Sequence, residues 1–333
     1  MSNTPVQKRV DIGGQAVMEG VMMKGPDAIA VAVRRPNGSI VVKRDVYTAP
    51  SKKHKWMGYP FIRGIINMGS MLSLGMKTLQ LSSNMLGLLD EEPSKFEKWL
   101  ANKLGKGIDK IVMGVAAVLA IVLSIGLFFA LPAVVGSLLR QVFHSKVVVN
   151  LLEGLVRILI LIGYMLFCGA IPDVRRTFQY HGAEHKTVYC HENDLPLTPE
   201  NARNFSPLHP RCGTTFLLIV FVLAILLYTL VGYNGTSYIL RLLSRLALLP
   251  IVAGISYEIL KGLAHTDGKL VRALRWPGLM MQKLTTRTPD DGMLEVAIAA
   301  MNAALYGVPE GEKTQEGYTV VPTATAQPQA IEA

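Results

Sequence analysis

Charged residues are scarce in this sequence. They make up 17% of it, against roughly 25% in typical soluble domains, whereas hydrophobic residues make up 50%. The 333 residues are therefore not expected to form a soluble protein of two ordinary domains. Acidic residues are outnumbered by basic ones, which gives a net charge of +10. No base-reading or phosphate-binding motif accompanies that charge, so we expect no nucleic acid as a partner.

Cysteine is scarce as well. The 3 cysteines, Cys168, Cys190 and Cys212, are too few for a disulfide framework. They are compatible with a reducing compartment, or with metal or thiol chemistry. The polar residues 1–10 lack the apolar stretch of a secretory signal, and no short apolar stretch with a cleavage site follows them, so no such signal is expected.

Four long apolar runs are present instead, and they predict an α-helical polytopic membrane protein. Residues 111–131 and 214–233 contain no charged residue and are long enough to cross a hydrocarbon core at about 1.5 Å per residue. Residues 151–171 and about 242–263 contain charged residues only near their ends. The lipid membrane is therefore the first partner that the sequence predicts.

The basic residues predict the orientation of these helices. With an even number of crossings, all but five of the 34 Lys and Arg residues lie on one side of the membrane. The positive-inside rule makes that side the cytoplasm and places both termini there. The five exceptions lie within the spans or on the other side: Arg140, Lys146, Arg157, Arg241 and Arg245.

Two charged residues lie near the start of the second span. Glu153 precedes Arg157 by four positions, so both side chains share one helix face and are expected to pair. A polar transport path through the membrane is the alternative interpretation.

Residues 1–55 predict a small cytoplasmic β-rich unit. Residues 29–33 and 40–46 are apolar and partly alternating, and the Asn37-Gly38 pair between them is a hairpin signal. A stretch with several glycines comes before them, and it lacks the spacing of a phosphate-binding loop.

The remaining segments are predicted from their polarity. Residues 56–110 are expected to hold an amphipathic helix in the membrane interface and a linker, although a helix that crosses the membrane is the alternative for residues 61–89. Residues 172–213 form a predicted cytoplasmic loop rich in histidine. Residues 264–306 predict cytoplasmic amphipathic and C-terminal helices, the last of them beginning at Thr288-Pro289-Asp290-Asp291. The polar residues 307–333 predict a disordered tail.

The histidine-rich loop carries the residues with chemical potential, since it holds four of the 7 histidines and two of the 3 cysteines. His181, Glu184 and His185 form the pattern H-x-x-E-H of inverted zinc proteases. On a helix, the two histidines share a face and can bind one divalent metal ion, for which zinc is the expected choice. Glu184 lies near that face and is expected to act as the general base on a metal-bound water.

A catalytic zinc also needs a third protein ligand and an open position. Glu258 is the candidate, because it lies at the cytoplasmic end of the fourth span, at the depth of the loop. A carboxylate in a span calls for a partner or a function, and pairing with Lys261 or with an arginine of the loop is the alternative. The reserve ligands are His209, Cys212, His265 and Asp267.

The motif also has a structural interpretation. The two histidines can instead hydrogen-bond lipid headgroups or neighbouring loops. Cys190 and Cys212 are compatible with ordinary thiols, because no C-x-x-C pattern accompanies them.

Several stretches of the sequence resemble one known family. They are residues 13–23, residues 180–186, residues 209–214 and the helix that starts at residues 289–291. Together they resemble the YqhQ-like family of bacterial membrane proteins, whose members are often described as predicted metal-dependent enzymes. The resemblance extends from about residue 11 to about residue 306. It implies a bacterial cytoplasmic membrane and a metal-dependent activity, and it implies no substrate.

These observations predict a metal-dependent membrane enzyme, a hydrolase, with its site on the cytoplasmic side. The alternative is a non-enzymatic membrane scaffold or assembly factor that presents the β-rich unit and the C-terminal helix to a partner. A transporter is the third possibility. It is disfavoured because four spans without an inverted repeat lack the usual transporter pattern.

Overall fold

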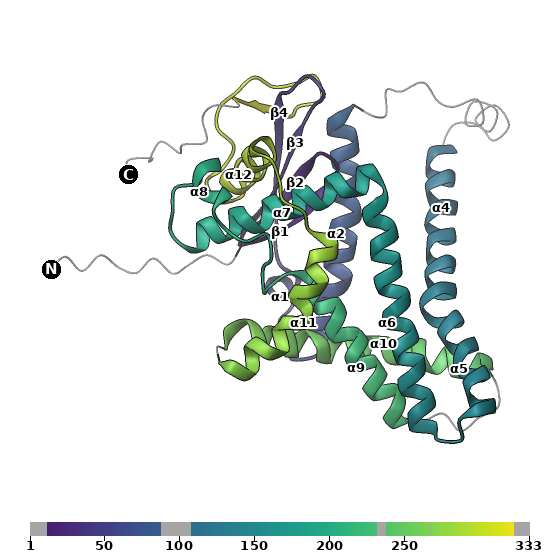
Figure 1. Ribbon diagram of the computed structural model, residues 1–333. Coiled ribbons are helices and arrows are strands. Elements are labelled where there is room, and N and C mark those ends of the chain that lie inside the picture. Colours follow the sequence, from purple (N-terminus) through teal and green to yellow (C-terminus); the bar gives the residue numbers. More distant parts are fainter. Residues whose placement is uncertain (1–11, 88–107, 232–237, 267, 323–333) are drawn as a thin grey trace.

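The computed structural model describes residues 12–87, 108–231, 238–266 and 268–322. Figure 1 shows a small sheet with helices packed around it, and a group of long helices that extends away from it. The chain is an α-helical polytopic membrane protein with a small β-sheet, as the sequence predicts.

The sheet consists of five antiparallel strands in the order of the chain. The predicted hairpin around Asn37-Gly38 is confirmed, since Arg34 pairs with Ile40 and Gly38 has a φ of 85°. The stretch with several glycines forms two further strands that the sequence did not predict. The strands are β1 (Gly13–Val17), β2 (Gly20–Lys24), β3 (Ala28–Arg34), β4 (Ile40–Val46) and β5 (Thr319–Val321).

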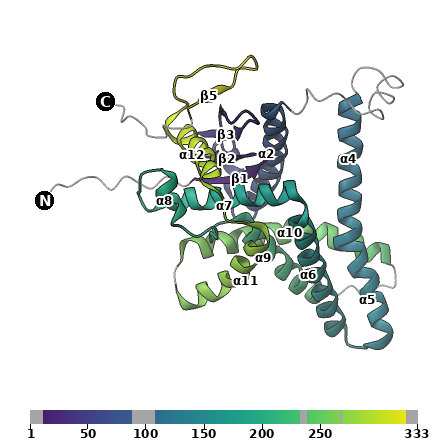
Figure 2. The same ribbon diagram turned by 45° about the horizontal axis from the view of Figure 1, so that its top comes forward.

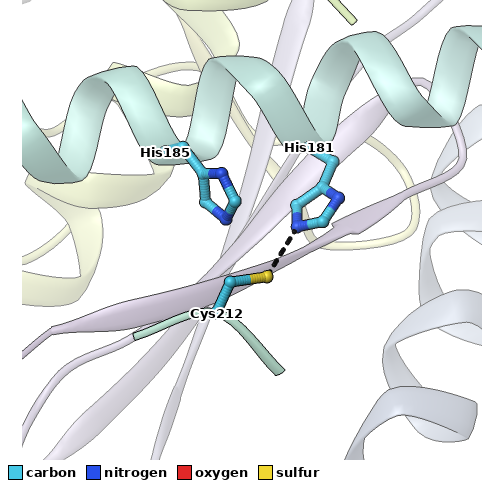
Figure 3. A group of neighbouring side chains, drawn as sticks. All are labelled: His181, His185 and Cys212. Carbon is cyan, nitrogen blue, oxygen red and sulfur yellow. Dashed lines mark hydrogen bonds between the residues drawn. The ribbon is translucent and has the colours of Figure 1, made fainter. Parts of the chain in front are cut away.

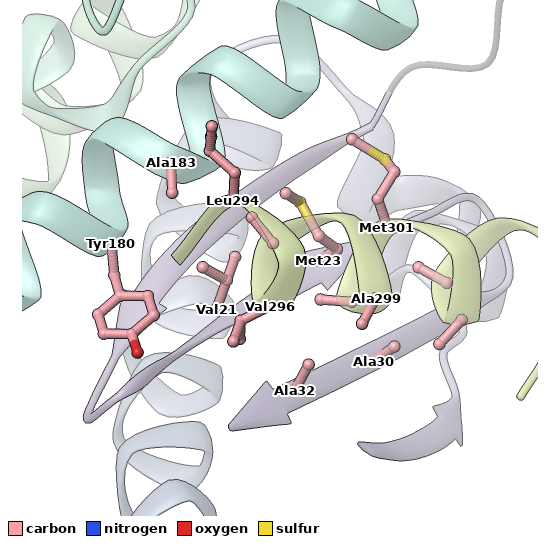
Figure 4. Close-up of a cluster of buried hydrophobic side chains, with 14 of the residues drawn as sticks. Val21, Met23, Ala30, Ala32, Tyr180, Ala183, Leu294, Val296, Ala299 and Met301 are labelled. Atoms are coloured by element: carbon pink, nitrogen blue, oxygen red, sulfur yellow. The ribbon is translucent and has the colours of Figure 1, made fainter. Parts of the chain in front are cut away.

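The two faces of the sheet bury alternate side chains against different helices, as expected for strands of period two. One face, which includes Val31 and Val41, packs against α2 (Ile62–Leu86). The other face packs against α7 (Pro172–Glu192) and α12 (Asp291–Tyr306), as Figure 4 shows for the side chains around α12. Figure 2 shows the sheet between α2 and α12. The β-rich unit therefore shares its core with segments far away in the sequence.

The prediction of a disordered tail is wrong for residues 307–322. There β5 pairs with β4, with Val42 opposite Thr319 and Ile40 opposite Val321. A β4 edge without this partner would leave backbone N–H and C=O groups unpaired, and the three β-branched residues of β5 suit a strand. Residues 323–333 lie outside the described part of the chain.

Four candidate membrane spans are present by length and composition, at residues 114–142, 147–170, 213–230 and 242–263. They lie in α4 (Ile108–Ile125) with α5 (Leu131–Val142), α6 (Lys146–Ala170), α9 (Gly213–Val231) and α10 (Tyr238–His265). The first span does not end at Pro132. A π-helix, Gly126–Ala130, joins α4 to α5 without a break, so that proline lies inside a continuous helix, where local π-helical adjustment compensates for its missing N–H.

Helix α2 occupies the residues for which an interfacial helix is predicted, and it is not among the four candidate spans. It packs against α10 and against β3 and β1. Two short helices, Pro50–Lys53 and Lys55–Gly58, precede it. Most of the predicted linker, residues 88–107, lies outside the described residues.

The predicted histidine-rich loop is largely helical. It consists of α7, the short α8 (Pro199–Arg203) and the segments that join them to α9. Helix α11 (Lys269–Thr285) then leads to α12. The last helix begins two residues later than predicted, since its N-cap is Asp290, whose side chain accepts a hydrogen bond from Met293 N.

Candidate metal centre

Helix α7 places the two motif histidines on one face, as their spacing of four requires. Their ring centroids are 4.4 Å apart. Between them, Gly182 lets the backbone of Arg287 approach closely, because a Cβ at this position would lie 2.1 Å from the Arg287 carbonyl oxygen. The glycine of the motif therefore allows the segment after α11 to pack on α7.

Backbone carbonyls orient both imidazoles. Nδ1 of His181 is 2.9 Å from the carbonyl oxygen of Thr285, and Nδ1 of His185 is 2.5 Å from that of Pro207. A carbonyl oxygen can only accept, so each Nδ1 carries the proton and each Nε2 keeps its lone pair. This is the arrangement that fixes the tautomer of metal-binding histidines in proteins.

Cys212 completes a group of three potential ligands. Its Sγ lies 3.2 Å from Nε2 of His181, and one ligand atom from each of Cys212, His181 and His185 lies within 4.8 Å of the others. Figure 3 shows the thiol and both imidazoles pointing toward one another. The Thr214 hydroxyl donates to the same Sγ at 3.3 Å.

Two buried side chains hold the segment that carries Cys212. The Lys186 ammonium donates to the carbonyl oxygens of Arg203 and Phe205. The Gln282 side chain accepts from His209 N at 2.8 Å and donates to the carbonyl oxygen of His209 at 2.7 Å. These contacts position the cysteine from α7 on one side and from α11 on the other.

Glu184 is buried beside this group. One of its carboxylate oxygens accepts a 3.0 Å hydrogen bond from Gly14 N, and the other lies 3.7 Å from Nε2 of His185. Burial raises the pKa of the Glu184 carboxyl, and the neighbouring histidines and the Gly14 N–H oppose that rise. A carboxyl whose pKa is raised by burial is a stronger base than an exposed one, which suits the role of a general base.

Burial also keeps the neighbouring imidazoles neutral. It lowers the pKa of His185, against the opposing effect of Cys212, and it lowers the pKa of His209 to about 4. Nε2 of His209 lies 3.2 Å from a carboxylate oxygen of Glu192, and its ring contacts Tyr189 at 4.4 Å between centroids. Within the described residues, His209 is therefore a neighbour of the three-residue group and not a member of it.

Glu258, the predicted third ligand, has a different partner. Its carboxylate forms an ion pair with the Arg63 guanidinium, with Nε to Oε1 at 2.8 Å, and it accepts from Phe61 N at 3.3 Å. This face of α10 packs on α2, and Glu258 is not a member of the three-residue group among the described residues, so we propose Cys212 in its place as the third ligand. Of the other reserve ligands, Asp267 and the side chain of His265 lie outside the described part of the structure.

Two imidazole nitrogens and one thiolate are a donor set that suits zinc. Catalytic zinc sites combine three such ligands with an open position for water, at Zn–N distances of about 2.0–2.1 Å and Zn–S of about 2.3 Å. The free lone pairs on both Nε2 atoms and their spacing to Sγ fit that requirement. The sequence contained the two histidines and the cysteine, but their supports at Pro207, Gln282 and Thr285 carry no motif.

Comparison with known proteins identifies the family. The family model "Protein of unknown function (DUF1385)" matches residues 59–306. The chain is also 36% identical over 299 residues to "Uncharacterized protein YqhQ" of Bacillus subtilis (strain 168), which covers 88% of this chain and 92% of that protein. No solved structure matches it. The chain is therefore a member of the DUF1385 family, to which the resemblance to YqhQ-like proteins pointed.

Proposed function

We propose that this membrane protein is a metal-dependent hydrolase, with one zinc ion bound by His181, His185 and Cys212. The observation that carries the proposal is the convergence of the two Nε2 atoms and Sγ, with both Nδ1 atoms hydrogen-bonded to backbone carbonyls. A histidine cluster with a purely structural role does not require both lone pairs to face a thiol.

Glu184 supplies the acid–base chemistry in this proposal. A zinc ion held by these residues would supply Lewis-acid chemistry, by lowering the pKa of a water molecule and polarising a substrate carbonyl or phosphoryl group. The role of Glu184 would be to accept a proton from the attacking water and to donate it to the leaving group. The hydrogen bond from Gly14 N fixes one carboxylate oxygen and leaves the other beside His185.

The proposed site lies at one end of the membrane helices, where α6 ends and α9 begins. In this proposal the end faces the cytoplasm, as the positive-inside rule leads us to expect. Substrates that lie in or on the cytoplasmic leaflet would therefore meet the site without crossing the membrane.

A thiol enzyme is the second candidate. The 3.2 Å contact between His181 Nε2 and Cys212 Sγ is also the geometry of a nucleophilic cysteine beside its base, and the Thr285 carbonyl would orient that base. In this case the thiolate attacks the substrate and no metal is held.

Cobalt substitution separates the two candidates. We expect protein loaded with Co²⁺ to show the near-ultraviolet absorption of a sulfur-to-cobalt transition, which is lost in Cys212→Ser and kept in the matched control Cys190→Ser. Absence of this absorption in the unmodified chain would contradict the zinc proposal. Rapid alkylation of Cys212 that slows in His181→Ala would then favour the thiol enzyme, and an unreactive Cys212 would favour a scaffold.

A further inference from the structure

The first half of α11 exposes apolar and basic side chains together. Leu270 and Leu274 are 74% and 56% exposed, and Trp276 is 60% exposed. The side chains of Lys269 and Arg272 are exposed on the same half of the helix. Residues three or four apart share a helix face, so the two leucines form one row, and the two basic residues and the tryptophan form the adjoining row. We call these five residues the α11 surface.

The α11 surface lies at the end of a membrane span. The fourth candidate span ends at Leu263, and α11 begins at Lys269. The Arg275 guanidinium donates to the carbonyl oxygens of Leu263 and Thr266, which fixes the first half of α11 to the end of α10. Figures 1 and 2 show this half of α11 on the side of the long helices away from α4. The start of α11 therefore lies at the level of the lipid headgroups.

The second half of α11 is buried between other helices. Met281 packs with Leu161 of α6 and with neighbouring side chains of α9. Gly278 lies directly against α9, because a Cβ there would be 2.6 Å from Cγ2 of Thr215. The protein interior thus holds α11 in place by its second half and leaves the α11 surface open to a partner.

The segment around the α11 surface has an excess of positive charge. Residues 259–289 contain six basic residues and one acidic residue, Asp267. Among the described residues, no carboxylate pairs with Lys269 or Arg272. A partner that carries negative charge therefore complements this surface.

The basic residues inside the spans differ from those of α11, because they are neutralised within the protein. Arg157 reaches the Glu153 carboxylate at 3.5 Å, which confirms the predicted pair, and Arg245 donates to the same carboxylate. The three side chains are buried. They offer no charge to an external partner, whereas the α11 surface does.

We propose that the α11 surface binds the headgroups of anionic phospholipids. A helix with leucine and tryptophan beside lysine and arginine suits a membrane surface, where its apolar side chains enter the acyl boundary and its basic ones meet the phosphates. Basic residues next to the end of a span are attracted to a negatively charged leaflet. Binding at this surface is independent of the proposed hydrolase, although Gln282 and Thr285 of the same helix support the candidate metal centre.

Quenching of Trp276 by brominated lipids tests the proposal. The full chain with Trp56→Phe and Trp99→Phe keeps Trp276 as its single tryptophan. It is reconstituted in dioleoyl phosphatidylcholine vesicles with increasing fractions of brominated phosphatidylglycerol or brominated phosphatidylcholine. At low salt we expect half-maximal quenching at an about fivefold lower fraction of phosphatidylglycerol, because each basic side chain near an anionic surface adds roughly that factor in affinity.

The variant Lys269→Gln/Arg272→Gln in this single-tryptophan chain removes the basic side chains. Both are exposed, so we expect an unchanged unfolding temperature in detergent and quenching by the two lipids that agrees within about twofold. The control Lys43→Gln/Lys313→Gln removes two charges from the sheet and should keep the preference for phosphatidylglycerol. An unchanged preference in Lys269→Gln/Arg272→Gln, or equal quenching by both lipids before that change, would overturn the proposal. Absence of quenching by either lipid would also overturn it, and would indicate that the surface faces water or a protein.

Discussion

The backbone N–H of Gly14 donates a 3.0 Å hydrogen bond to Oε1 of Glu184, and so joins the first strand to the helix that carries the candidate site. Gly14 fits there only because it has no side chain. A Cβ at this position would lie 2.6 Å from the Met22 carbonyl oxygen and 2.8 Å from Cγ of Glu184. The sheet therefore positions the proposed base from a segment 170 residues away in the sequence.

Gly14→Ala tests this relationship. We expect the added methyl group to lower the free energy of unfolding by about 2 kcal/mol, as overpacking does, and to displace Glu184. Zinc content should stay unchanged, because Glu184 is not a proposed ligand. Gly13→Ala is the matched control, since a Cβ at Gly13 meets nothing within 4 Å. Equal unfolding temperatures for the two variants would contradict the account.

Gln282→Leu tests the support of Cys212 by α11. The variant leaves the backbone N–H and carbonyl of His209 without their buried partner, so we expect a loss of about 3 kcal/mol in unfolding free energy. Zinc affinity should fall about 10- to 100-fold, the usual effect of removing an outer support of a metal site. Competition with a chelator measures that affinity. Gln179→Leu is the control, because it removes only one long contact of 3.4 Å. Its unfolding free energy and zinc affinity should equal those of the unmodified chain.

Glu258→Gln tests the reassignment of the third ligand. Because Glu258 pairs with Arg63, we expect this variant to keep its full zinc content. The weakened contact between α2 and α10 should lower the free energy of unfolding by about 2 kcal/mol, as expected for a hydrogen bond to a charged group. Arg63→Gln should show the same loss. A fall in zinc content in Glu258→Gln alone would restore the carboxylate as a ligand.

The cysteines should differ in their pH-dependent reactivity. Burial raises the pKa of the Cys190 thiol, so its thiolate fraction stays low until the pH exceeds the ordinary cysteine range. We expect iodoacetamide to leave Cys190 unmodified between about pH 7 and pH 9, and to modify Cys212 only after zinc is removed. Mass spectrometry of the digested chain measures both reactions. Modification of Cys190 at the rate of Cys212 in this range would contradict the burial argument.

Local patterns explain which parts of this molecule could be predicted from the sequence. The apolar runs indicated the four spans, and the spacing of His181 and His185 placed both on one helix face. Glu258 was chosen for its depth along a span, but depth does not determine which neighbour a helix face contacts. Cys212 joins the histidines through contacts with α7 and α11, and β5 returns to β4 across most of the chain. Such contacts depend on tertiary packing and have no local signal.

The metal content of the detergent-purified chain tests the central claim most directly. Elemental mass spectrometry would compare the unmodified chain with the double variant His181→Ala/His185→Ala. The control is His144→Ala/His191→Ala, which removes two histidines outside the candidate group. We predict about one zinc per chain in the unmodified protein, in the control and in Glu184→Gln, and none in the double variant. Full zinc content in the double variant, or no zinc in the unmodified chain after reloading, would contradict the account.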